Sequence, residues 1–383
     1  MEMKTVHIGD LGEIKTGSTP SKKNPDNYGD YALWIKPTDI NPDEKYTHVV
    51  EEMFSEKAAN DCRSRLIPAK SICVPCIGTV GTKLTMTPCD CFVNQSINAV
   101  MPNEDYDNDY VYYLLLNFLP NLKSINKGTA SGREYIAKSA FENIEIKVHS
   151  DIEVQRTIGK ILSAYDDMID NCKKQIALLE EAAQRLYREW FHNNLSNGVL
   201  SDLAKDVGKS IKKSERRNFE SYTPIDCLTK KSLAYYSSKD ISFAESSLKS
   251  FSPKDILFGA MRVYFHKVCI AQDKGLTRST CIVLNARDHK FWAYLVLLLF
   301  SDDSVAWATA NSKEGTTMPY ITWEKLKQMP IYVPSDIEAE KFNILVELYL
   351  SNLIVLAKYV RNLIEIKEVL LGRLISGQIE INA

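Results

Sequence analysis

Four cysteines at close spacing are the side chains in this sequence best suited to binding a metal ion. Cys73 and Cys76 are followed by Cys89 and Cys91, and four thiolates can hold zinc in a tetrahedral site. The stretch from Cys73 to Cys76 is apolar and typical of a β-strand. We therefore expect buried free thiols and no bound metal, with a zinc site as the alternative.

The sequence contains a fragment that resembles one catalytic-site motif, but no complete motif of this kind. Gly208-Lys209-Ser210 has the ending of a phosphate-binding loop, but the first glycine of that motif would fall at position 203, which is Leu203. The sequence has no Asn-Pro-Pro-Tyr type motif for adenine methylation and no Gly-rich cofactor loop after a strand. It also lacks His-Glu-x-x-His and Gly-x-Ser-x-Gly. These observations predict a binding protein that is not itself an enzyme.

Side chains suited to DNA are present in both halves of the chain. Cations can contact phosphates, and guanidinium or amide groups can read base edges. The candidate DNA-binding residues are Lys36, Thr79, Lys83, Asn94, Gln95, Lys127, Ser131, Arg133, Lys212, Lys213, Arg216, Arg217, Arg262, Lys274, Arg278 and Lys313. The basic stretch 209–217 could equally be a solvated linker. Asn94 and Gln95 could equally satisfy buried backbone groups.

The composition excludes several classes of protein. The formal net charge is -2, so any DNA-binding surface must be local. With 45% hydrophobic and 25% charged residues, the 383-residue chain is typical of a soluble protein of two or three domains. The longest apolar run, Phe291 to Phe300, is about half the ~20 residues of a membrane span. Nine cysteines without a signal peptide predict a reduced, cytoplasmic protein.

An internal repeat of about 185 residues must position these side chains. Residues 146–153 (IKVHSDIE) match residues 331–338 (IYVPSDIE). Tyr135-Ile136 matches Tyr320-Ile321 at the same offset, and weaker matches precede both in the same order. Because five matches in order are a poor fit to chance, we predict two similar modules that act on a partner with two similar parts. The alternative is an old duplication without present function.

Each repeat ends in a segment that predicts a long helix. Ser150-x-x-Glu153 and Ser335-x-x-Glu338 both fit capping boxes, and the apolar positions that follow repeat as in a coiled coil. The predicted helix-pairing residues are Ile158, Leu162, Tyr165, Ile169, Ile176, Leu179 and Leu186 in the first helix, and Leu348, Val355, Tyr359, Leu363, Ile366 and Leu370 in the second. We expect the helices to pair antiparallel as a spacer. The alternative is that each packs only on its own domain.

The predicted fold is therefore α/β (α+β), with two similar mixed modules, two long helices that form an antiparallel coiled coil, and a pseudo-two-fold internal repeat. Short β-type runs separated by Gly, Pro and Asp support the mixed modules. The expected segments are a first module at 1–150, a central helix at 151–195, a second module at 196–335 and a C-terminal helix at 336–383.

The order of these motifs resembles the specificity subunit of type I restriction-modification systems along essentially the whole chain. The resemblance rests on residues 151–170 and on residues 179–191 (LEEAAQRLYREWF), which look like that family's central conserved helix. Residues 16–21 (TGSTPS) with 31–36 (YALWIK) resemble the opening of its target-recognition domains. Residues 76–81 with 94–98, the Gly-rich loop 128–132, and residues 255–266 in the second module fit the same pattern.

The resemblance implies that each module is a target-recognition domain that reads one half of a bipartite double-stranded DNA site in the major groove. The helices would set the gap between the halves and dock two methyltransferase (M) subunits, and restriction (R) subunits would join them. This chain would bind no cofactor, with S-adenosylmethionine, ATP and Mg on the partner subunits. The family's function is adenine methylation and defence against foreign DNA. One departure is that Gln155 has no counterpart at Glu340, so the two partner-binding surfaces could be unequal.

Two other classes of function compete with this interpretation. A coiled-coil scaffold would share the helices but would not need cationic loops, and a silent specificity cassette would keep the whole pattern. A free-standing nucleic-acid enzyme would need a metal or cofactor constellation that the sequence does not contain. Loss of binding at rising salt would favour DNA over protein as the partner, because neutralised phosphates release counterions.

Overall fold

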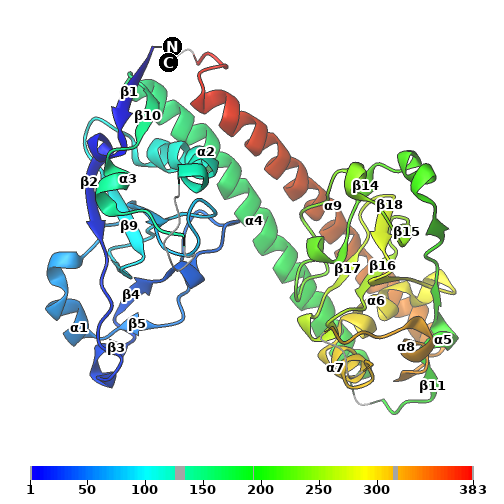
Figure 1. Ribbon diagram of the computed structural model, residues 1–383. Helices are drawn as coiled ribbons and strands as arrows, with labels where there is room; N and C mark the ends of the chain where they lie inside the picture. Colours follow the sequence, from blue (N-terminus) through cyan, green and yellow to red (C-terminus); the bar gives the residue numbers. More distant parts are fainter. Residues whose placement is uncertain (1, 126–133, 193, 314–317, 382–383) are drawn as a thin grey trace. The chain divides into compact units, whose positions relative to one another are not determined.

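The computed structural model describes residues 2–125, 134–192, 194–313 and 318–381. Its residues form two compact units, which we call unit 1 (Met1–Asp167 with Glu365–Ala383) and unit 2 (Met168–Ile364). Two long helices, α4 (Ile152–Phe191) and α9 (Asp336–Ile375), occupy the segments predicted for them (Figure 1). Each helix belongs partly to both units, so the compact units do not follow the predicted segment limits.

Unit 1 is built on two small sheets. The central sheet has the order β2-β9-β6-β7, all antiparallel, with the strands β2 (Gly12–Thr16), β9 (Ile97–Pro102), β6 (Ile72–Pro75) and β7 (Thr85–Met86). The second sheet has the order β3-β5-β4-β8, with the strands β3 (Tyr28–Gly29), β5 (Met53–Phe54), β4 (Ala32–Ile35) and β8 (Phe92–Val93). A separate ribbon pairs β1 (Met3–His7) with β10 (Glu145–His149).

The main core of unit 1 lies between its central sheet and the helices α2 (Asn108–Ile125), α3 (Lys138–Glu142) and parts of α4 and α9. The short helix α1 (Glu56–Asp61) packs on the second sheet. Tyr110 and Tyr113 of α2 are fully buried in one cluster with Ile158 and Leu162 of α4, and Leu374 of α9 joins the same cluster. Both long helices therefore complete this core.

Unit 2 likewise has a four-stranded central sheet, a second four-stranded sheet and a two-stranded ribbon. Its central sheet has the order β12-β19-β16-β17, with the strands β12 (Ala204–Asp206), β19 (Cys281–Ala286), β16 (Ile256–Gly259) and β17 (Val268–Ile270). Its second sheet has the order β13-β15-β18-β14, with the strands β13 (Ser210–Ile211), β15 (Leu248–Phe251), β18 (Gly275–Arg278) and β14 (Ser221–Tyr222). The ribbon pairs β11 (Gly198–Val199) with β20 (Pro330–Ile331).

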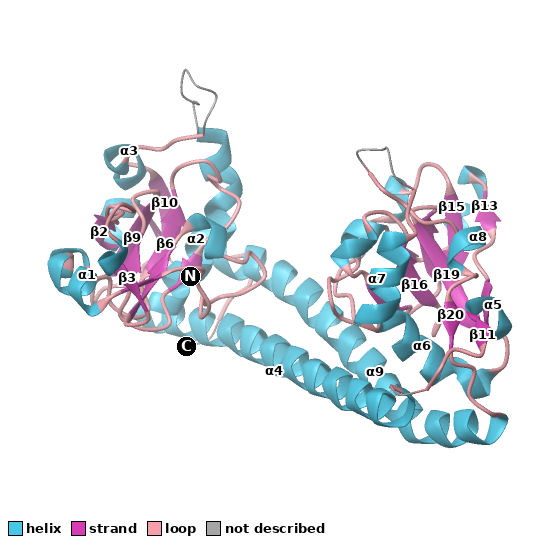
Figure 2. Cartoon of the chain, turned by 90° about the horizontal axis from the view of Figure 1, so that it is seen from below, coloured by secondary structure: helices cyan, strands magenta, loops and turns pink. Residues whose placement is uncertain are grey.

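The shorter helices of unit 2 are α5 (Leu200–Leu203), α6 (Trp292–Phe300), α7 (Asp302–Ala310) and α8 (Trp323–Leu326). Every residue of α6 is buried, as expected for the most apolar run of the sequence. Figure 2 shows the strands of each unit gathered between helices and loops. The mixed α/β class predicted from the sequence is confirmed.

The long helices begin with different caps. At α9 the predicted capping box is confirmed, because Ser335 N–H donates to the Glu338 carboxylate at 2.9 Å and Glu338 N–H donates to the Ser335 hydroxyl at 3.4 Å. At α4 the prediction was wrong. Asp151 is the cap, and its carboxylate accepts from Glu153 N–H at 2.8 Å. An aspartate directly before the first helical residue displaces the serine one position earlier.

The apolar stripe of α4 is largely buried. Of its predicted pairing residues, Ile158, Leu162, Ile169 and Ile176 are buried, and the other three are half-buried.

On α9 the predicted stripe is largely the wrong one. Leu348, Val355, Tyr359 and Ile366 are exposed, whereas only Leu363 is buried and Leu370 is half-buried. The buried stripe consists of Ala339, Phe342, Val346, Leu350, Leu353, Ala357, Val360 and Leu363. Because α9 has apolar side chains on two faces, periodicity alone did not identify the packed one. By length and composition α9 could also cross a membrane, although 39% of its most apolar window is buried inside the protein.

Contacts within unit 1 define how the two long helices meet there. Asp166 of α4 forms an ion pair with Lys367 of α9. Beyond the end of α9, a Cβ added to Gly377 would lie 3.7 Å from the His149 ring, just before α4 begins. The partners therefore run in opposite directions along the chain, so this part of α9 is antiparallel to α4. Within unit 2, the Phe342 ring contacts Trp190 and Phe191 with centroids 5.6 and 4.9 Å apart.

Candidate nucleic-acid interface

The predicted DNA-binding residues that come together lie at one end of each central sheet. In unit 1, β6 ends at Pro75 opposite Ile97, where β9 begins. In unit 2, β16 ends at Gly259 opposite Cys281, where β19 begins. The loop that leaves one strand and the loop that enters the other therefore share an end of the sheet. We call these segments, 76–82 with 94–96 and 260–266 with 278–280, the sheet-end loops.

Hydrogen bonds show that the sheet-end loops of the two units are equivalent. Ile136 N–H donates to the Cys76 carbonyl at 3.0 Å, and Ile321 N–H donates to the Ala260 carbonyl at 2.9 Å. Isolated bridges pair Ile77 with Tyr135 in unit 1 and Met261 with Tyr320 in unit 2. The repeated Tyr-Ile pair of the sequence therefore has the same structural role in both units. Its backbone pairs with the loop that follows β6 in unit 1 and β16 in unit 2.

The sheet-end loops of unit 2 present cations beside aromatic rings. Arg262 is half-buried, whereas Arg278, the last residue of β18, is exposed. Lys313 is exposed with its ammonium 5.5 Å from the centre of the Tyr320 ring. Tyr320 and the neighbouring Tyr264 keep 38% and 52% of their surface exposed. Such a set can contact phosphates and bases, and sequence reasoning missed the two tyrosines because exposure of a single aromatic residue has no local signature.

The sheet-end loops of unit 1 are less charged. Thr79 and Asn94 are half-buried, and Gln95 is exposed beside the Thr19 hydroxyl. The Asn94 side-chain oxygen accepts from Ser96 N–H at 2.6 Å, so it shapes its own turn. The alternative of backbone satisfaction therefore accounts for that oxygen. Lys127, Ser131 and Arg133 lie outside the described residues.

Four predicted cations have polar partners within the fold, and the longest of these contacts joins the Lys213 ammonium to the Glu245 carboxylate at 3.8 Å. Lys36 is bound to both Glu51 and Glu52 at 2.8 Å. The Lys83 ammonium donates to the Ile40 carbonyl at 3.1 Å, and burial lowers its pKa. Arg216 donates to the carbonyls of Ser242 and Ala244, both at 3.1 Å. The acceptors of Lys36 are 15 and 16 residues away in the chain and those of Arg216 are 26 and 28 away, so local sequence could not reveal them.

The remaining candidates lie away from the sheet end. Lys213 and Arg217 are exposed on a short 3-10 helix (Lys213–Asn218), and Lys212 precedes it. The basic stretch is thus ordered structure rather than a linker. Lys274 precedes β18 and therefore lies at the opposite end of that strand from Arg278, with its ammonium 5.2 Å from the Phe219 ring.

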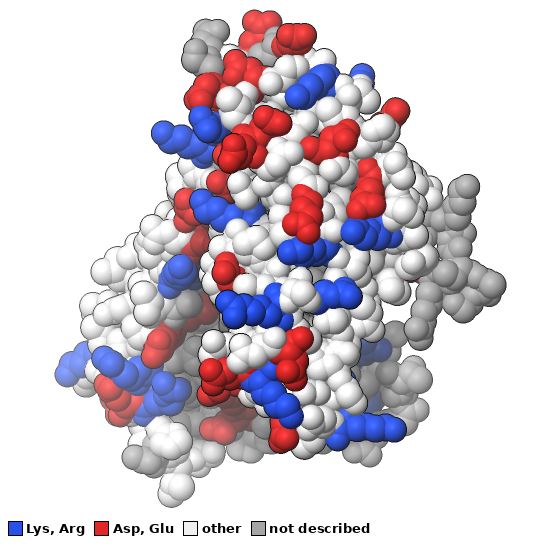
Figure 3. Space-filling model, turned by 90° about the vertical axis from the view of Figure 1, so that its left-hand side faces the viewer, with Lys and Arg blue, Asp and Glu red and all other residues white. Residues whose placement is uncertain are grey.

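On the face of the molecule that Figure 3 shows, neither sign of charge predominates. Figure 3 shows one face on which basic and acidic side chains are interspersed. A local surface such as the sheet-end loops of unit 2 is therefore a better candidate for phosphate contact than the overall field of the protein.

The cysteines are placed as core residues. Cys73 and Cys91 belong to one buried apolar cluster. Burial raises the pKa of Cys73 to about 12 and that of Cys76 to about 11. Among the residues that the structure describes, no group of three His, Cys, Asp or Glu side chains is placed to hold a metal ion.

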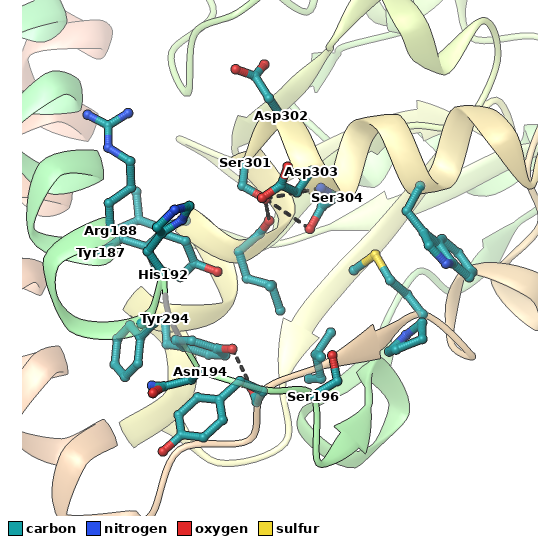
Figure 4. A pocket seen from close by; sticks show the side chains of 18 of the residues that line it. Tyr187, Arg188, His192, Asn194, Ser196, Tyr294, Ser301, Asp302, Asp303 and Ser304 are labelled. Carbon is teal, nitrogen blue, oxygen red and sulfur yellow. Dashed lines mark hydrogen bonds between the residues drawn. The ribbon is translucent and has the colours of Figure 1, made fainter.

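A cavity of about 450 Å³ in unit 2 lies between the C-terminal end of α4 and helices α6 and α7 (Figure 4). Tyr187, Arg188 and His192 line it on one side, and Asp302 and Asp303 line it at the start of α7. Several of its polar groups are used by the fold. The Tyr294 hydroxyl donates to the Tyr332 carbonyl, and Ser301 caps α7 through Ser304 N–H. The cavity is therefore part of the joint through which α4 packs on the second module.

Comparisons with known proteins agree with this architecture. Residues 1–181 match the family model described as type I restriction modification DNA specificity domain. The chain is 25% identical to the type I restriction enzyme MjaIX specificity subunit of Methanocaldococcus jannaschii, over 98% of this chain and 93% of that one. It is 34% identical to the HindI specificity subunit of Haemophilus influenzae over 182 residues, which cover 47% of this chain and 38% of that one.

Among solved structures, the S subunit of a type I restriction-modification system from M. genitalium aligns with 100% of this chain and 97% of its own, with a TM-score of 0.61 and 15% identity. At that identity the likeness shows the fold. This structural match extends over the whole chain and is in keeping with the sequence matches. Residues 1–181 thus match the model of the type I restriction modification DNA specificity domain, and the chain as a whole is similar to specificity subunits of type I systems.

Proposed function

We propose that this chain is the DNA-reading subunit of a type I restriction-modification complex, in which each unit reads one half of a bipartite double-stranded DNA site. The chain is not itself catalytic, in keeping with relatives named as specificity subunits. The observation that carries the proposal is the equivalence of the sheet-end loops. Two copies of one framework, with different side chains at the same loop positions, suit a ligand with two similar but non-identical halves.

The sheet-end loops would approach DNA with different chemistry in the two units. In unit 2, Arg278 and Lys313 would contact phosphates, and the exposed tyrosines would pack on the sugar or base surface. In unit 1, Thr79 and Gln95 would offer polar contacts. Lys127, Ser131 and Arg133 remain candidates of the first module.

The long helices would serve as the spacer and as the docking site for two methyltransferase subunits. Exposed apolar residues of α9 support this role, because they recur at helical spacing and have little of the protein over them. They are Ile337, Ile344, Leu348, Val355, Tyr359, Ile366 and Val369. An apolar stripe of this length is typical of a surface that another helix covers. Methyltransferase and restriction subunits would contribute S-adenosylmethionine, ATP and Mg, and the complex would work in the cytoplasm.

The same stripe would also suit a scaffold that binds only protein, so the first experiment must separate DNA reading from assembly. The chain is expressed with its cognate methyltransferase in a host without adenine methylation, and the methylome is read by single-molecule sequencing. We expect methylation at a two-part motif that disappears when this chain is omitted. A soluble complex of the two proteins that methylates no new motif would contradict DNA reading and would leave the scaffold or a silent cassette.

A second measurement tests the interface itself. Arg278→Glu should weaken binding of the complex to its methylated motif about 10-fold or more at physiological salt, because a phosphate or base contact becomes a repulsion. The matched control is Lys325→Glu, which reverses an exposed charge on α8 of the same unit, outside the sheet-end loops and the other candidate residues. Equal affinities of both variants and the unaltered protein would remove Arg278 from the interface.

A further inference from the structure

One residue of the unit 2 sheet-end loops has a backbone conformation that its type disfavours. Arg262 has φ 50° and ψ 56°, in the left-handed region that residues with a Cβ rarely adopt. Conformations of this kind persist where the surrounding structure enforces them, and they concentrate at functional sites. An arginine in this conformation therefore suggests a role for its side chain.

The equivalent residue of unit 1 is Gly78, for which the same conformation carries no steric cost. Gly78 has φ 80°, and its N–H donates to the Glu134 carbonyl at 2.9 Å. Arg262 N–H donates to the Pro319 carbonyl at 2.8 Å, so the two loops share their backbone path. Glycine is the residue that this path favours. The backbone conformation at position 262 therefore disfavours arginine, and does not explain why unit 2 has one there.

Two other left-handed residues of unit 2, Lys254 and His266, have side-chain contacts that explain them. The buried His266 ring lies 2.9 Å from the Phe300 carbonyl and 3.3 Å from the Asp302 carboxylate. Lys254 forms an ion pair with Glu347 at 2.6 Å, and its counterpart in unit 1, Lys70, has positive φ as well. The Arg262 guanidinium has no hydrogen bond or ion pair with another residue that the structure describes, so the fold gives it no comparable role.

The surroundings of Arg262 suit contact with a base. Met261 bridges to Tyr320, which places Arg262 next to an exposed tyrosine and the Lys313 ammonium above its ring. A phosphate contact needs only a cation within reach, which a flexible lysine on an unstrained backbone supplies. A base edge instead requires an aimed donor pair. The guanidinium fork matches the two acceptors that guanine presents in the major groove.

We propose that Arg262 is a specificity-determining residue of the second module, and that its guanidinium reads a guanine in the half-site bound by unit 2. The first module leaves the same position empty through Gly78. This inference rests on the proposed function, because it assigns one residue of the DNA-reading surface. It also implies that the two modules differ in sequence preference at the base pair that faces this loop position.

The experiment compares three variants of the full chain in complex with the cognate methyltransferase. Arg262→Gly removes the guanidinium and relieves the backbone. Gly78→Arg adds a guanidinium to unit 1, where a Cβ would meet no atom within 4 Å. Ser247→Gly is the matched control, because Ser247 is also left-handed (φ 52°) and exposed in unit 2 but carries no charge. Each variant is analysed by methylome sequencing, by binding to oligonucleotides changed at one base pair at a time, and by thermal unfolding.

We expect Arg262→Gly to lose discrimination at one G·C pair of one half-site, by about 10- to 100-fold, while the other half-site keeps its preference. Its unfolding temperature should be unchanged or higher, because glycine favours the left-handed backbone. Ser247→Gly should share the thermal effect and keep the motif. Gly78→Arg should alter the preference only in the other half-site.

Three results would overturn the inference. Arg262→Gly could retain full discrimination at every base pair. It could weaken binding to all sequences equally while the salt dependence falls by about one phosphate contact, which would make Arg262 a phosphate ligand. Alternatively, it could lower the unfolding temperature, which would make Arg262 a structural residue. If the unaltered complex bound no two-part site at all, the proposed function itself would fail, and the role of Arg262 would fail with it.

Discussion

The two units share a framework and differ in what is attached to it. Their central sheets have equivalent strand orders, and their sheet-end loops are held by the same hydrogen bonds. Their second sheets differ. In unit 1, β5 pairs with β4 of the parallel pair β4–β8, whereas in unit 2 β15 pairs with β18 of the parallel pair β14–β18. Since β8 and β18 both lead directly into the equivalent strands β9 and β19, the added strand lies on opposite edges of the pair. The duplication has therefore preserved the frame of the module and allowed its periphery to diverge.

The units also use different chemistry to hold the long helices. In unit 1, Lys45 is buried against Asp109 of α2 and Ser163 of α4. In unit 2, the buried Glu180 carboxylate of α4 accepts from the Ser232 hydroxyl at 2.7 Å and from Leu233 N–H at 2.6 Å. A cation anchors one module and a carboxylate anchors the other. Divergence thus reaches the joints of the modules as well as their second sheets.

The largest effect is expected where unit 2 packs on α9. Phe342 is fully buried against Trp190 and Phe191, so Phe342→Ala should cost about 3–5 kcal/mol of local stability. Leu348→Ala, on the exposed face of the same helix, should cost less than about 0.5 kcal/mol and should instead weaken methyltransferase binding. Hydrogen exchange along α9 measures both costs. Similar losses of protection would mean that the two stripes of α9 are not distinct.

The next prediction tests whether both long helices support the modules in the same way. Gln155 of α4 accepts from Asp107 N–H at 3.1 Å, before α2. Asn343 of α9 accepts from Ala293 N–H at 3.0 Å, at the start of α6. Gln155→Ala and Asn343→Ala should each cost about 1–3 kcal/mol, because each leaves a backbone group unpaired. Exchange rates of the first turns of α2 and α6 report the loss.

Glu340→Ala is the control for that pair, because Glu340 is the exposed residue aligned with Gln155 in the sequence repeat. It should leave exchange in α6 unchanged. If Glu340→Ala increased exchange in α6 as much as Asn343→Ala does, then position 340 would support the module as Gln155 does in unit 1. The proposed difference in position between Gln155 and Asn343 would then be wrong.

A smaller, pH-dependent effect should separate the two joints. Burial raises the pKa of Glu180, against the opposing hydrogen bonds from Ser232 and Leu233. A raised folded-state pKa means that the ionised carboxylate destabilises unit 2 at pH values above it and that the penalty disappears as pH falls. Glu180→Gln should therefore raise the unfolding temperature at pH 7.5 and lose this advantage towards pH 5. Glu365→Gln, at an exposed site on α9, should show no such trend.

The smallest effect concerns the caps. Ser335→Ala should cost about 1 kcal/mol at the start of α9, whereas Ser150→Ala should cost little, because Asp151 caps α4. Exchange of the first-turn amides of each helix measures the difference. Equal losses at both serines would restore the symmetric capping boxes that the repeated Ser-x-x-Glu motif predicts.

Sequence patterns predicted the elements whose signals are local. The repeated Tyr-Ile pairs, the two long helices and the apolar stripe of α4 follow from residue spacing, because the other faces of α4 are polar. The packed stripe of α9 did not follow, since Phe342 and Leu348 belong to equally apolar faces and only tertiary contact chooses between them. Gln155 was noticed as a departure from the repeat, but its role became visible only with Asn343 one turn further along the equivalent helix.

The candidate interface was predictable in outline but not in detail. Lys36 and Arg216 are of residue types that bind DNA, yet Lys36 forms an ion pair and Arg216 donates hydrogen bonds to acceptors elsewhere in their own modules. Arg262 and Gly78 occupy matching positions of the repeat, but their shared left-handed backbone is a property of the folded loop. Residue type predicts what a side chain could bind, whereas the fold decides whether it is available.

The two ends of the described chain meet in unit 1. A Cβ on Gly377 would come 3.3 Å from the Met3 sulfur. The start of the first module and the segment after the second long helix are therefore neighbours in space, although the whole of both repeats separates them along the chain. A circular permutant opened in the exposed segment 194–197 and joined through a short linker should therefore fold to the same structure. The order in which the two modules are encoded is thus a property of the gene rather than of the fold.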